Sequence, residues 1–361
     1  HTHSPMVFLR SFAEDLPLDR WLNEAVFPNE AKLLPEDSYT LTKLAVCEYL
    51  SGGTTSCFDM YFSAPEQTAK AFIDTGFRGV FCGAVNNFCG SPKLLEEHYV
   101  KLNSISPLIS YKPGFHAEYT TSLEIMEQIA ALAQKYHAPV WCHNSETKSE
   151  TEGCISRYGK TPTELMESIG MFEYGGGGYH CVYFTENDMD IFRRHNMTAV
   201  TNPASNSKLA SGIADISSLM SHGINVAIGT DGAASNNALD MFREMYLCTV
   251  LQKLRYSDAA AMPAENVLRA ATLGGAKAME LDCGSIEAGK LADFAVVDMR
   301  RPSMQPENDI VKNLVFSGSK DIIRMTAVGG KILYENGGFA GIDTEKLYHD
   351  CARICERIFA K

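Results

Sequence analysis

The sequence has no hydrophobic run that could cross a membrane and no excess of basic residues. No apolar stretch approaches the ~18 residues that a spanning helix needs, and no basic segment followed by an apolar one opens the chain as in a signal peptide. The chain has 32 Lys and Arg residues against 44 Asp and Glu, a formal net charge of −12. Because a phosphate backbone attracts positive charge, this balance argues against sequence-independent binding to nucleic acid. We therefore expect a soluble protein with no membrane or nucleic-acid partner.

Cysteine pairs of the C-x-x-C type are also missing, although the chain has 11 cysteines. Cys57, Cys82, Cys142 and Cys181 lie inside apolar runs, where a reduced thiol packs as a small hydrophobic side chain. An odd number of cysteines in a long chain without a secretion signal is typical of a reducing compartment. We predict free thiols and a cytoplasmic protein.

Length and composition fit a globular protein. The 361 residues are 45% hydrophobic and 21% charged, which excludes a disordered chain. Usual domain sizes predict one domain of about 250 residues and a smaller second part. The first residue is His1 and not methionine, so we expect the natural protein to extend upstream.

Short apolar segments alternate with longer helical patterns over residues 39–279, which is typical of parallel strands joined by helices. Nearly every residue in the short segments is apolar, as in strands buried on both faces. The predicted strands are 54–60, 79–85, 108–115, 139–143, 179–183, 198–201 and 225–230. Predicted helices include 122–136, 186–195 and 238–254. Seven such units predict an α/β fold, a (β/α)8 TIM barrel whose first strand would lie just before His1.

Beyond Asp282 the pattern changes to short strands without long helices. Residues 284–298 and 331–335 predict strands, and an apolar stripe predicts a closing helix over 345–358. We predict a barrel domain at 1–283, a small β domain at 284–342 that is the C-terminal part of a composite β-sandwich, and a C-terminal helix at 343–361. Residues 175–178 are all glycine and predict a flexible turn, because their spacing is not that of a dinucleotide-binding loop.

Side chains able to bind a metal or transfer a proton lie at the ends of the predicted strands, where barrel enzymes place their active sites. His1 and His3 form an H-x-H pair, and alternate residues of an extended segment share one face. His143 ends the run PVWCH, and Glu146 follows three residues later. The other candidates are His116, His180 and Asp231.

Each candidate alone has a simpler explanation. An H-x-H pair at a chain start is usually solvated or left by a tag, a lone His in an apolar strand is usually a core residue, and Asp in G-T-D-G usually forms the turn. Their coincidence at strand ends favours one shared site. Histidine and aspartate together suit one Zn²⁺ ion, or Fe²⁺, with a position left for water. A metal lowers the pKa of bound water to about 7, and Glu146 beside that water would be the proton shuttle.

The chain resembles the amidohydrolase superfamily, and within it the methylthioadenosine/S-adenosylhomocysteine deaminase and chlorohydrolase branch. The resemblance covers nearly the whole chain and depends on the segments HTHSPMVFLRSFAEDLPLDRWL, CHNSE, YHCVY, NPASNSKLASGIA, GTDGAASNN and GSIEAGKLADFAVVD. It implies that one metal ion is held by His1, His3, His143 and Asp231. It also implies that Glu146 protonates the substrate ring, that His180 orients the attacking water, and that Asp231 accepts the proton of that water.

The same resemblance implies a substrate pocket. His116 matches the family's substrate-contacting histidine, Trp21 its base-stacking tryptophan, and Glu30 the glutamate that binds ribose hydroxyls. Two departures are visible. Tyr183 replaces a second histidine that is not a ligand in the family, and residues 82–93 contain no arginine where members that accept S-adenosylhomocysteine bind its carboxylate. The family's upstream segment supplies the first barrel strand, so without it we expect an open barrel edge and a frayed His1.

The leading interpretation is metal-dependent hydrolytic deamination of an adenine nucleoside, with release of ammonia. The substrate would be 5′-methylthioadenosine, with S-adenosylhomocysteine and adenosine as further possibilities. Alternatives are a free base or chlorotriazine as substrate, and a barrel that binds without catalysis. Glu30 favours a nucleoside, since a free base has no ribose. A binuclear site with a carboxylated lysine is disfavoured because Lys112 lies near the start of its strand. We expect a small-molecule substrate and a homo-oligomer.

Overall fold

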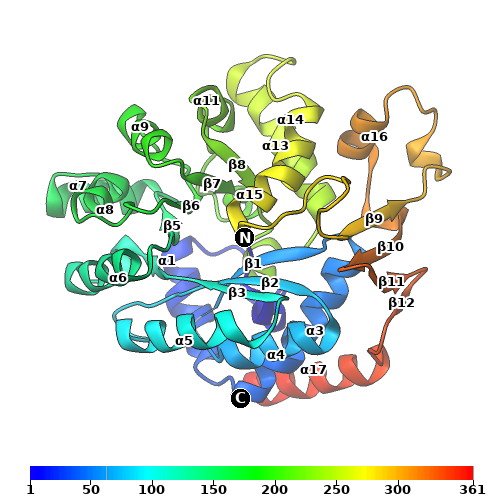
Figure 1. Ribbon diagram of the computed structural model, residues 1–361, viewed down its shortest axis with the longest axis horizontal. Coiled ribbons are helices and arrows are strands. Elements are labelled where there is room, and N and C mark those ends of the chain that lie inside the picture. Colours follow the sequence, from blue (N-terminus) through cyan, green and yellow to red (C-terminus); the bar gives the residue numbers. More distant parts are fainter. Residues whose placement is uncertain (62, 361) are drawn as a thin grey trace.

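The central feature of the computed structural model, which describes residues 1–61 and 63–360, is a parallel β-barrel surrounded by helices (Figure 1). Its strands are β1 (Ser56–Met60), β2 (Arg78–Cys82), β3 (Ile109–Lys112), β4 (Gly114–Ala117), β5 (Val140–Asn144), β6 (Gly176–His180), β7 (Thr198–Thr201) and β8 (Asn225–Ile228). Strands β1–β2–β3 pair in that order, as do β4–β5–β6–β7–β8, all in parallel. Only Pro113 separates β3 from β4, because proline has no N–H to continue the ladder. The predicted (β/α)8 barrel is confirmed.

The N-terminal residues occupy the barrel position between β1 and β8. Thr2 bridges Asp59 in parallel, its N–H donating to the Phe58 carbonyl at 3.0 Å. On the other side, the His1 carbonyl accepts from the N–H groups of Thr230 (3.0 Å) and Asp231 (3.1 Å). His1 is only 8% exposed. The expectation of a frayed His1 is therefore wrong, because both neighbouring segments hold it.

The helices lie outside the barrel strands (Figure 1). The longer ones are α3 (Pro35–Ser51), α4 (Pro65–Thr75), α5 (Pro92–Ile105), α6 (Leu123–Tyr136), α7 (Lys148–Tyr158), α9 (Glu186–Arg194) and α13 (Met241–Tyr256). Shorter helices are α1 (Leu18–Arg20), α2 (Phe27–Glu30), α8 (Pro162–Ser168), α10 (Pro203–Lys208), α11 (Ile216–Ser221), α12 (Ala233–Asn236), α14 (Ala264–Arg269) and α15 (Gly275–Met279). Single 3₁₀ or π turns are η1 (Ser4–Leu9), η2 (Trp21–Val26), η3 (Glu118–Thr120), η4 (Ala270–Gly274), η5 (Pro302–Met304) and η6 (Lys320–Ile322). The helix predicted at 122–136 begins one residue later because Ser122 caps it, its hydroxyl accepting from the Ile125 N–H.

The glycine run was predicted as a flexible turn, and this prediction is wrong. Gly176–Gly178 begin β6, which ends at His180, so the strand predicted at 179–183 is displaced towards the N-terminus. A β-carbon at Gly177 would lie 2.2 Å from Trp141 Cζ3, and one at Gly176 would lie 2.0 Å from the Val140 carbonyl oxygen. The glycines therefore let β6 approach β5 closely. Sequence periodicity missed the strand because glycine contributes no hydrophobic side chain.

Gly177→Ala should destabilise the protein. The added methyl group would overlap the Trp141 ring, and overpacking of this kind costs about 1–3 kcal/mol of the free energy of unfolding. Gly275→Ala is the matched control, because its β-carbon would meet nothing closer than Met279 Cε at 4.0 Å. Denaturant unfolding of both variants measures the difference. Equal stabilities would show that β6 does not need glycine here.

A small antiparallel sheet follows the barrel and lies to its right in Figure 1. It has the order β12 (Gly338–Phe339), β11 (Lys331–Glu335), β10 (Ile323–Val328) and β9 (Phe294–Val297). The strand predicted at 331–335 is confirmed, but only the end of 284–298 is a strand, and α16 (Ile310–Ser317) was not predicted. The closing helix is α17 (Thr344–Phe359), whose predicted apolar stripe is buried and which packs against α3. The division at residues 283 and 342 stays a prediction.

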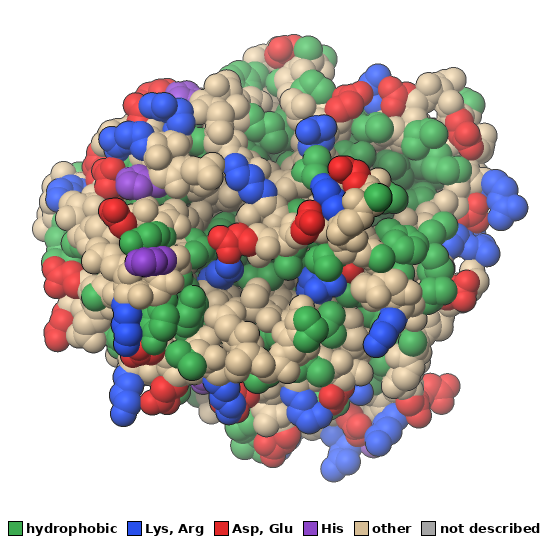
Figure 2. Space-filling model, viewed as in Figure 1, with side chains coloured by type: hydrophobic (Ala, Val, Ile, Leu, Met, Phe, Trp, Pro, Cys, Tyr) green, Lys and Arg blue, Asp and Glu red, His purple; other side chains and the backbone are tan. Residues whose placement is uncertain are grey.

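The distribution of charged side chains on the surface and the state of the cysteines both agree with the composition of the chain. Acidic and basic side chains are interspersed over the face in Figure 2, and hydrophobic ones gather over α16 and the small sheet. All eleven cysteines are free. In the part of the chain that the structure describes, no helix has both the length and the apolar character needed to cross a bilayer.

Candidate active site

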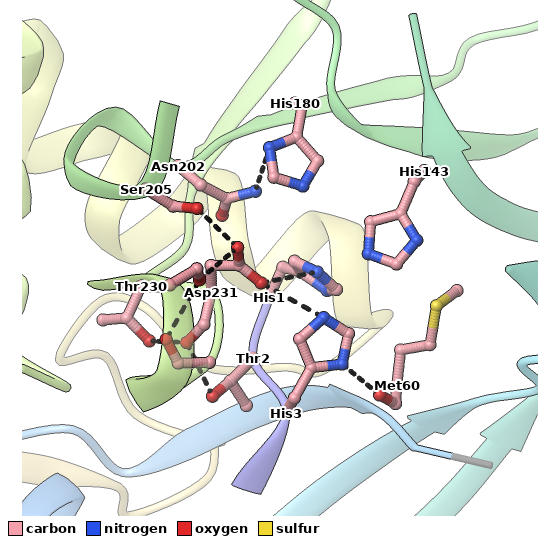
Figure 3. Close-up of polar contacts among 12 residues, drawn as sticks. His1, Thr2, His3, Met60, His143, His180, Asn202, Ser205, Thr230 and Asp231 are labelled. Carbon is pink, nitrogen blue, oxygen red and sulfur yellow. Dashed lines mark hydrogen bonds and ion pairs between the residues drawn. The ribbon is translucent and has the colours of Figure 1, made fainter. Parts of the chain in front are cut away.

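The carboxyl ends of the barrel strands bring the predicted metal ligands together (Figure 3). Ring nitrogens of His1, His3 and His143 lie within 4.8 Å of one another. His1, His180 and Asp231 form a second such group, so five donors surround one space. His143 and His180 come from the ends of β5 and β6, and Asp231 follows β8. Residues separated by up to 230 positions thus form one cluster, which we call the histidine–aspartate cluster.

Asp231 is fixed through both carboxylate oxygens. Oδ1 lies 3.1 Å from His3 Nε2 and 3.6 Å from His1 Nε2. Oδ2 accepts hydrogen bonds from the hydroxyls of Ser205 (2.6 Å) and Ser235 (2.7 Å). Burial acts to raise the pKa of Asp231, but the hydrogen bond and charge of His3 outweigh it and hold that pKa well below its usual range. The group is therefore an oriented carboxylate with Oδ1 facing the histidines.

Backbone carbonyls set the tautomers of two histidines. His3 Nδ1 donates to the Met60 carbonyl, and His143 Nδ1 donates to the His116 carbonyl at 2.8 Å. His143 Nε2 then presents a lone pair to the cluster, the arrangement that metal-binding histidines use, whereas His3 Nε2 faces Asp231 Oδ1 at 3.1 Å. Burial and the neighbouring histidine charges lower the pKa of His143 well below its usual value, so its imidazole is neutral.

His1 shows that these residues fit a metal ion. Both of its ring nitrogens are buried, and neither has a hydrogen-bond partner among the described residues. An unpaired buried nitrogen costs about 1–3 kcal/mol unless something binds it. A divalent ion that prefers nitrogen and oxygen donors would bind one of these two nitrogens together with the neighbouring donors.

Glu146 lies beside the cluster and not within it. It is buried, its Oε1 accepts from the Ser211 hydroxyl at 3.2 Å, and its Oε2 is 3.7 Å from His180 Nε2. Burial raises the pKa of Glu146, so the carboxyl keeps its proton to higher pH than an exposed one. The buried Glu150 on α7 holds this loop, accepting from the N–H groups of Ser145 (3.1 Å) and Glu146 (2.7 Å).

His180 has a strained backbone and a fixed ring. Its φ is +72°, a conformation that residues other than glycine rarely adopt. Its Nδ1 is 2.7 Å from Asn206 Oδ1, which fixes a proton there and directs Nε2 towards Glu146. Asn202 also lies against Nδ1, at 3.4 Å.

The three predicted substrate-binding residues line a cavity that opens onto the cluster. Trp21 is buried, and its indole N–H has no hydrogen-bond partner among the described residues. Burial raises the pKa of Glu30 to about 7, although a hydrogen bond from Tyr61 opposes this rise. His116 Nδ1 is 2.9 Å from the Thr120 hydroxyl, and burial lowers the pKa of His116 to about 4. A larger apolar cavity of about 430 Å³ lies between β1, β8 and the small sheet, away from Glu146 and Glu30.

Sequence reasoning assigned no role to the residues that hold the cluster in place. They are Ser205, Asn206, Ser211, Ser235, Glu150 and Glu244. Glu244 joins two loops, accepting from the Ala204 N–H (2.9 Å) and from Asn236 Nδ2 (2.6 Å). Four of the six belong to the segments NPASNSKLASGIA and GTDGAASNN, and this membership was the only sign of their function.

Comparison with known proteins agrees with this geometry. The sequence profile of the amidohydrolase family matches residues 1–333. The chain belongs to the amidohydrolase family. This amidohydrolase is 39% identical over 365 residues to a 5-methylthioadenosine/S-adenosylhomocysteine deaminase of Clostridium tetani, covering 99% of this chain and 85% of the relative. It is 37% identical over 368 residues to a 5'-deoxyadenosine deaminase of Methanosarcina acetivorans, covering 100% of this chain and 85% of that protein.

Solved structures share the fold. A zinc-bound adenosine deaminase from Xanthomonas campestris superposes with a TM-score of 0.94 at 33% identity, covering 99% of this amidohydrolase and 84% of that chain. A triazine hydrolase variant superposes with a TM-score of 0.90 at 21% identity, covering 98% and 86% of the two chains. Because the identity is only 21%, the similarity to the triazine hydrolase variant shows a shared fold and nothing about function.

Proposed function

We propose that this amidohydrolase removes the 6-amino group of an adenine nucleoside by hydrolysis and releases ammonia. The observation that carries the proposal is the single buried cavity joining the histidine–aspartate cluster to two carboxyl groups, Glu146 and Glu30. In this proposal Glu146 acts on the purine ring and Glu30 binds the sugar. The deaminase names of the relatives support the same substrate class.

In this proposal one divalent ion is held by His1, His3, His143 and Asp231. Zn²⁺ suits this donor set best, and Fe²⁺ is the alternative. When bound, the ion supplies a Lewis acid that lowers the pKa of water to about 7. His180 also belongs to one group of metal-competent donors. We assign His180 to the attacking water and the tetrahedral oxygen, because its Nε2 lies 3.7 Å from Oε2 of the proton donor Glu146.

The chain's own residues move the protons. Glu146, whose pKa is raised by burial, donates its proton to N1 of the purine as C6 is attacked. Asp231 has Oδ2 bound by two serine hydroxyls, so Oδ1 accepts the proton of the attacking water and returns it to the departing ammonia. Trp21 stacks on the base, His116 contacts the substrate, and Glu30 accepts hydrogen bonds from the ribose hydroxyls.

Glu30→Ala should cut kcat/KM for 5′-methylthioadenosine by roughly ten- to a hundred-fold. Above pH 7, where Glu30 is ionised, its carboxylate accepts from both ribose hydroxyls in charge-assisted hydrogen bonds worth about 1.5–3 kcal/mol. Glu24→Ala is the control, because Glu24 lies on the same segment but is exposed and paired with Arg20. A 2′,3′-dideoxy analogue should be a poor substrate of the parent enzyme and lose little more in the variant. An unchanged kcat/KM in Glu30→Ala would remove Glu30 from the ribose site.

Ammonia release from a panel of substrates tests the function. The panel is adenosine, 5′-methylthioadenosine, S-adenosylhomocysteine, guanine and a chlorotriazine. Among the described residues that line the cavity none is Lys or Arg, so we expect S-adenosylhomocysteine, with its carboxylate, to react less well than the methylthio compound. Equal rates on guanine or a chlorotriazine, with no response to Glu30→Ala, would contradict the proposal. Homo-oligomer formation and a cytoplasmic location stay predictions, the first to be measured by light scattering.

A further inference from the structure

The segment His1–Ser4 presents alternate residues to opposite sides. The side chains of His1 and His3 point to one side, where they join His143, His180 and Asp231 in the histidine–aspartate cluster (Figure 3). Thr2 and Ser4, on the other side, both meet one hydroxyl group, that of Tyr49 on α3. Tyr49 Oη lies 2.7 Å from Thr2 Oγ1 and 2.9 Å from Ser4 Oγ.

The direction of these hydrogen bonds is determined by their neighbours. The Thr2 hydroxyl donates to the Asp231 carbonyl at 3.1 Å, so its oxygen must accept the proton of Tyr49. The Tyr49 oxygen is then free to accept from the Ser4 hydroxyl. The three hydroxyls form a chain, Ser4 to Tyr49 to Thr2, that ends on the backbone of Asp231.

Backbone bonds hold this segment at the edge of β1. Thr2 is held by Phe58 and Met60 of the β1 edge, and the Ser4 N–H lies 3.3 Å from both carboxylate oxygens of Asp59. Among the described residues no hydrogen bond holds the ring of His1, so its direction depends on the backbone of residues 1–4. A contact on the face opposite the histidines resists rotation of that segment about its axis.

Tyr49 is suited to resist it. It is 2% exposed, and its ring stacks on Phe77 with centroids 5.4 Å apart. In this packed position the Tyr49 hydroxyl already lies within hydrogen-bond distance of both Thr2 and Ser4. Burial also raises the pKa of Tyr49 well above its usual value, so the hydroxyl keeps the proton that it donates.

We propose that Tyr49 is a positioning residue of the metal centre: by binding Thr2 and Ser4 together, its hydroxyl aims His1 and His3 at one ion. The proposal rests on the proposed metal-binding function of His1 and His3. Tyr49 lies behind the H-x-H segment and contacts neither ligand side chain. Its effect on the metal therefore passes through the backbone of residues 1–4.

Tyr49→Phe tests this in the full chain, because it removes one oxygen and leaves the stacked ring. Zinc dissociation constants are measured by competition with a chromophoric chelator, and thermal unfolding is measured on the metal-free protein. We expect zinc to bind about three- to tenfold more weakly, the fold-change that corresponds to the loss of a buried hydrogen bond behind the ligand segment. Tyr39→Phe is the matched control. Tyr39 lies on the same helix as Tyr49, but its hydroxyl donates to Asp74 Oδ2 at 2.8 Å on the protein surface.

A second variant shows whether the hydroxyls act as one chain. Thr2→Val keeps the shape of the side chain and removes its oxygen. If Tyr49 acts through Thr2, the double variant should bind zinc little more weakly than Tyr49→Phe alone. Additive losses would show that Tyr49 acts by another route and would overturn the proposal.

The outcomes separate this proposal from the proposed function. A parent protein that binds no zinc or other divalent ion overturns both. Tight zinc binding in the parent and in Tyr49→Phe, within about twofold, overturns the positioning role alone and leaves the deaminase proposal standing. A loss of zinc affinity matched by an equal loss of stability in the metal-free protein would show a general packing role and would likewise overturn it.

Discussion

His143→Ala should lose the metal ion and the deaminase activity together. His143 is buried at the end of β5, its Nδ1 held by the His116 carbonyl at 2.8 Å, so its Nε2 is aimed into the cluster before any ion binds. Removing it takes away one of the three ring nitrogens that lie within 4.8 Å of one another. The metal contributes several kcal/mol to the reaction, so kcat/KM should fall by more than about a thousand-fold.

Elemental analysis beside steady-state kinetics measures both losses. The parent protein should hold one divalent ion per chain, and the variant should hold much less than one. His349→Ala is the control, since its side chain is 71% exposed on α17, far along the chain from the cluster. Two ions per chain, or active protein with none, would contradict the ligand assignment.

Glu146→Gln should keep the metal and lose roughly 10²–10⁴ in kcat, the usual contribution of a general acid–base. The amide has nearly the shape of the carboxyl and can still accept from the Ser211 hydroxyl, so the loop should not move. It cannot donate an acidic proton to the purine ring. Glu152→Gln is the control, because Glu152 is exposed on the neighbouring α7 and pairs with Lys148.

The pH profile gives a second readout for Glu146. Burial raises its pKa, and the protonated carboxyl is the form that acts as the acid. Activity of the parent should therefore be present below that pKa and be lost as the pH rises through it. Glu146→Gln should lack this alkaline limb. Loss of zinc in the variant, or an unchanged alkaline limb, would assign Glu146 a different role.

The sequence alone was enough to predict the class of the fold and the grouping of histidines with Asp231. Apolar segments such as 198–201 and 225–230 are buried on both faces whatever their neighbours are, so their periodicity identifies parallel strands. Side chains placed at strand ends must meet at one end of a barrel. That rule is sufficient to predict that His1, His143 and Asp231 share a site, because it depends on strand direction and not on the details of packing.

Only the tertiary structure decided how the site is held. Positions 176 and 177 of β6 need glycine because Val140 and Trp141 of β5 leave no room for a β-carbon, which no local pattern shows. The raised pKa of Glu30 depends on burial. Ser205 lies 26 positions from Asp231, Asn206 lies 26 positions from His180, and Tyr49 lies 47 positions from Thr2. Hydrogen bonds of this kind are made between segments that barrel closure brings together, so their partners are determined by the closed fold and not by spacing along the sequence.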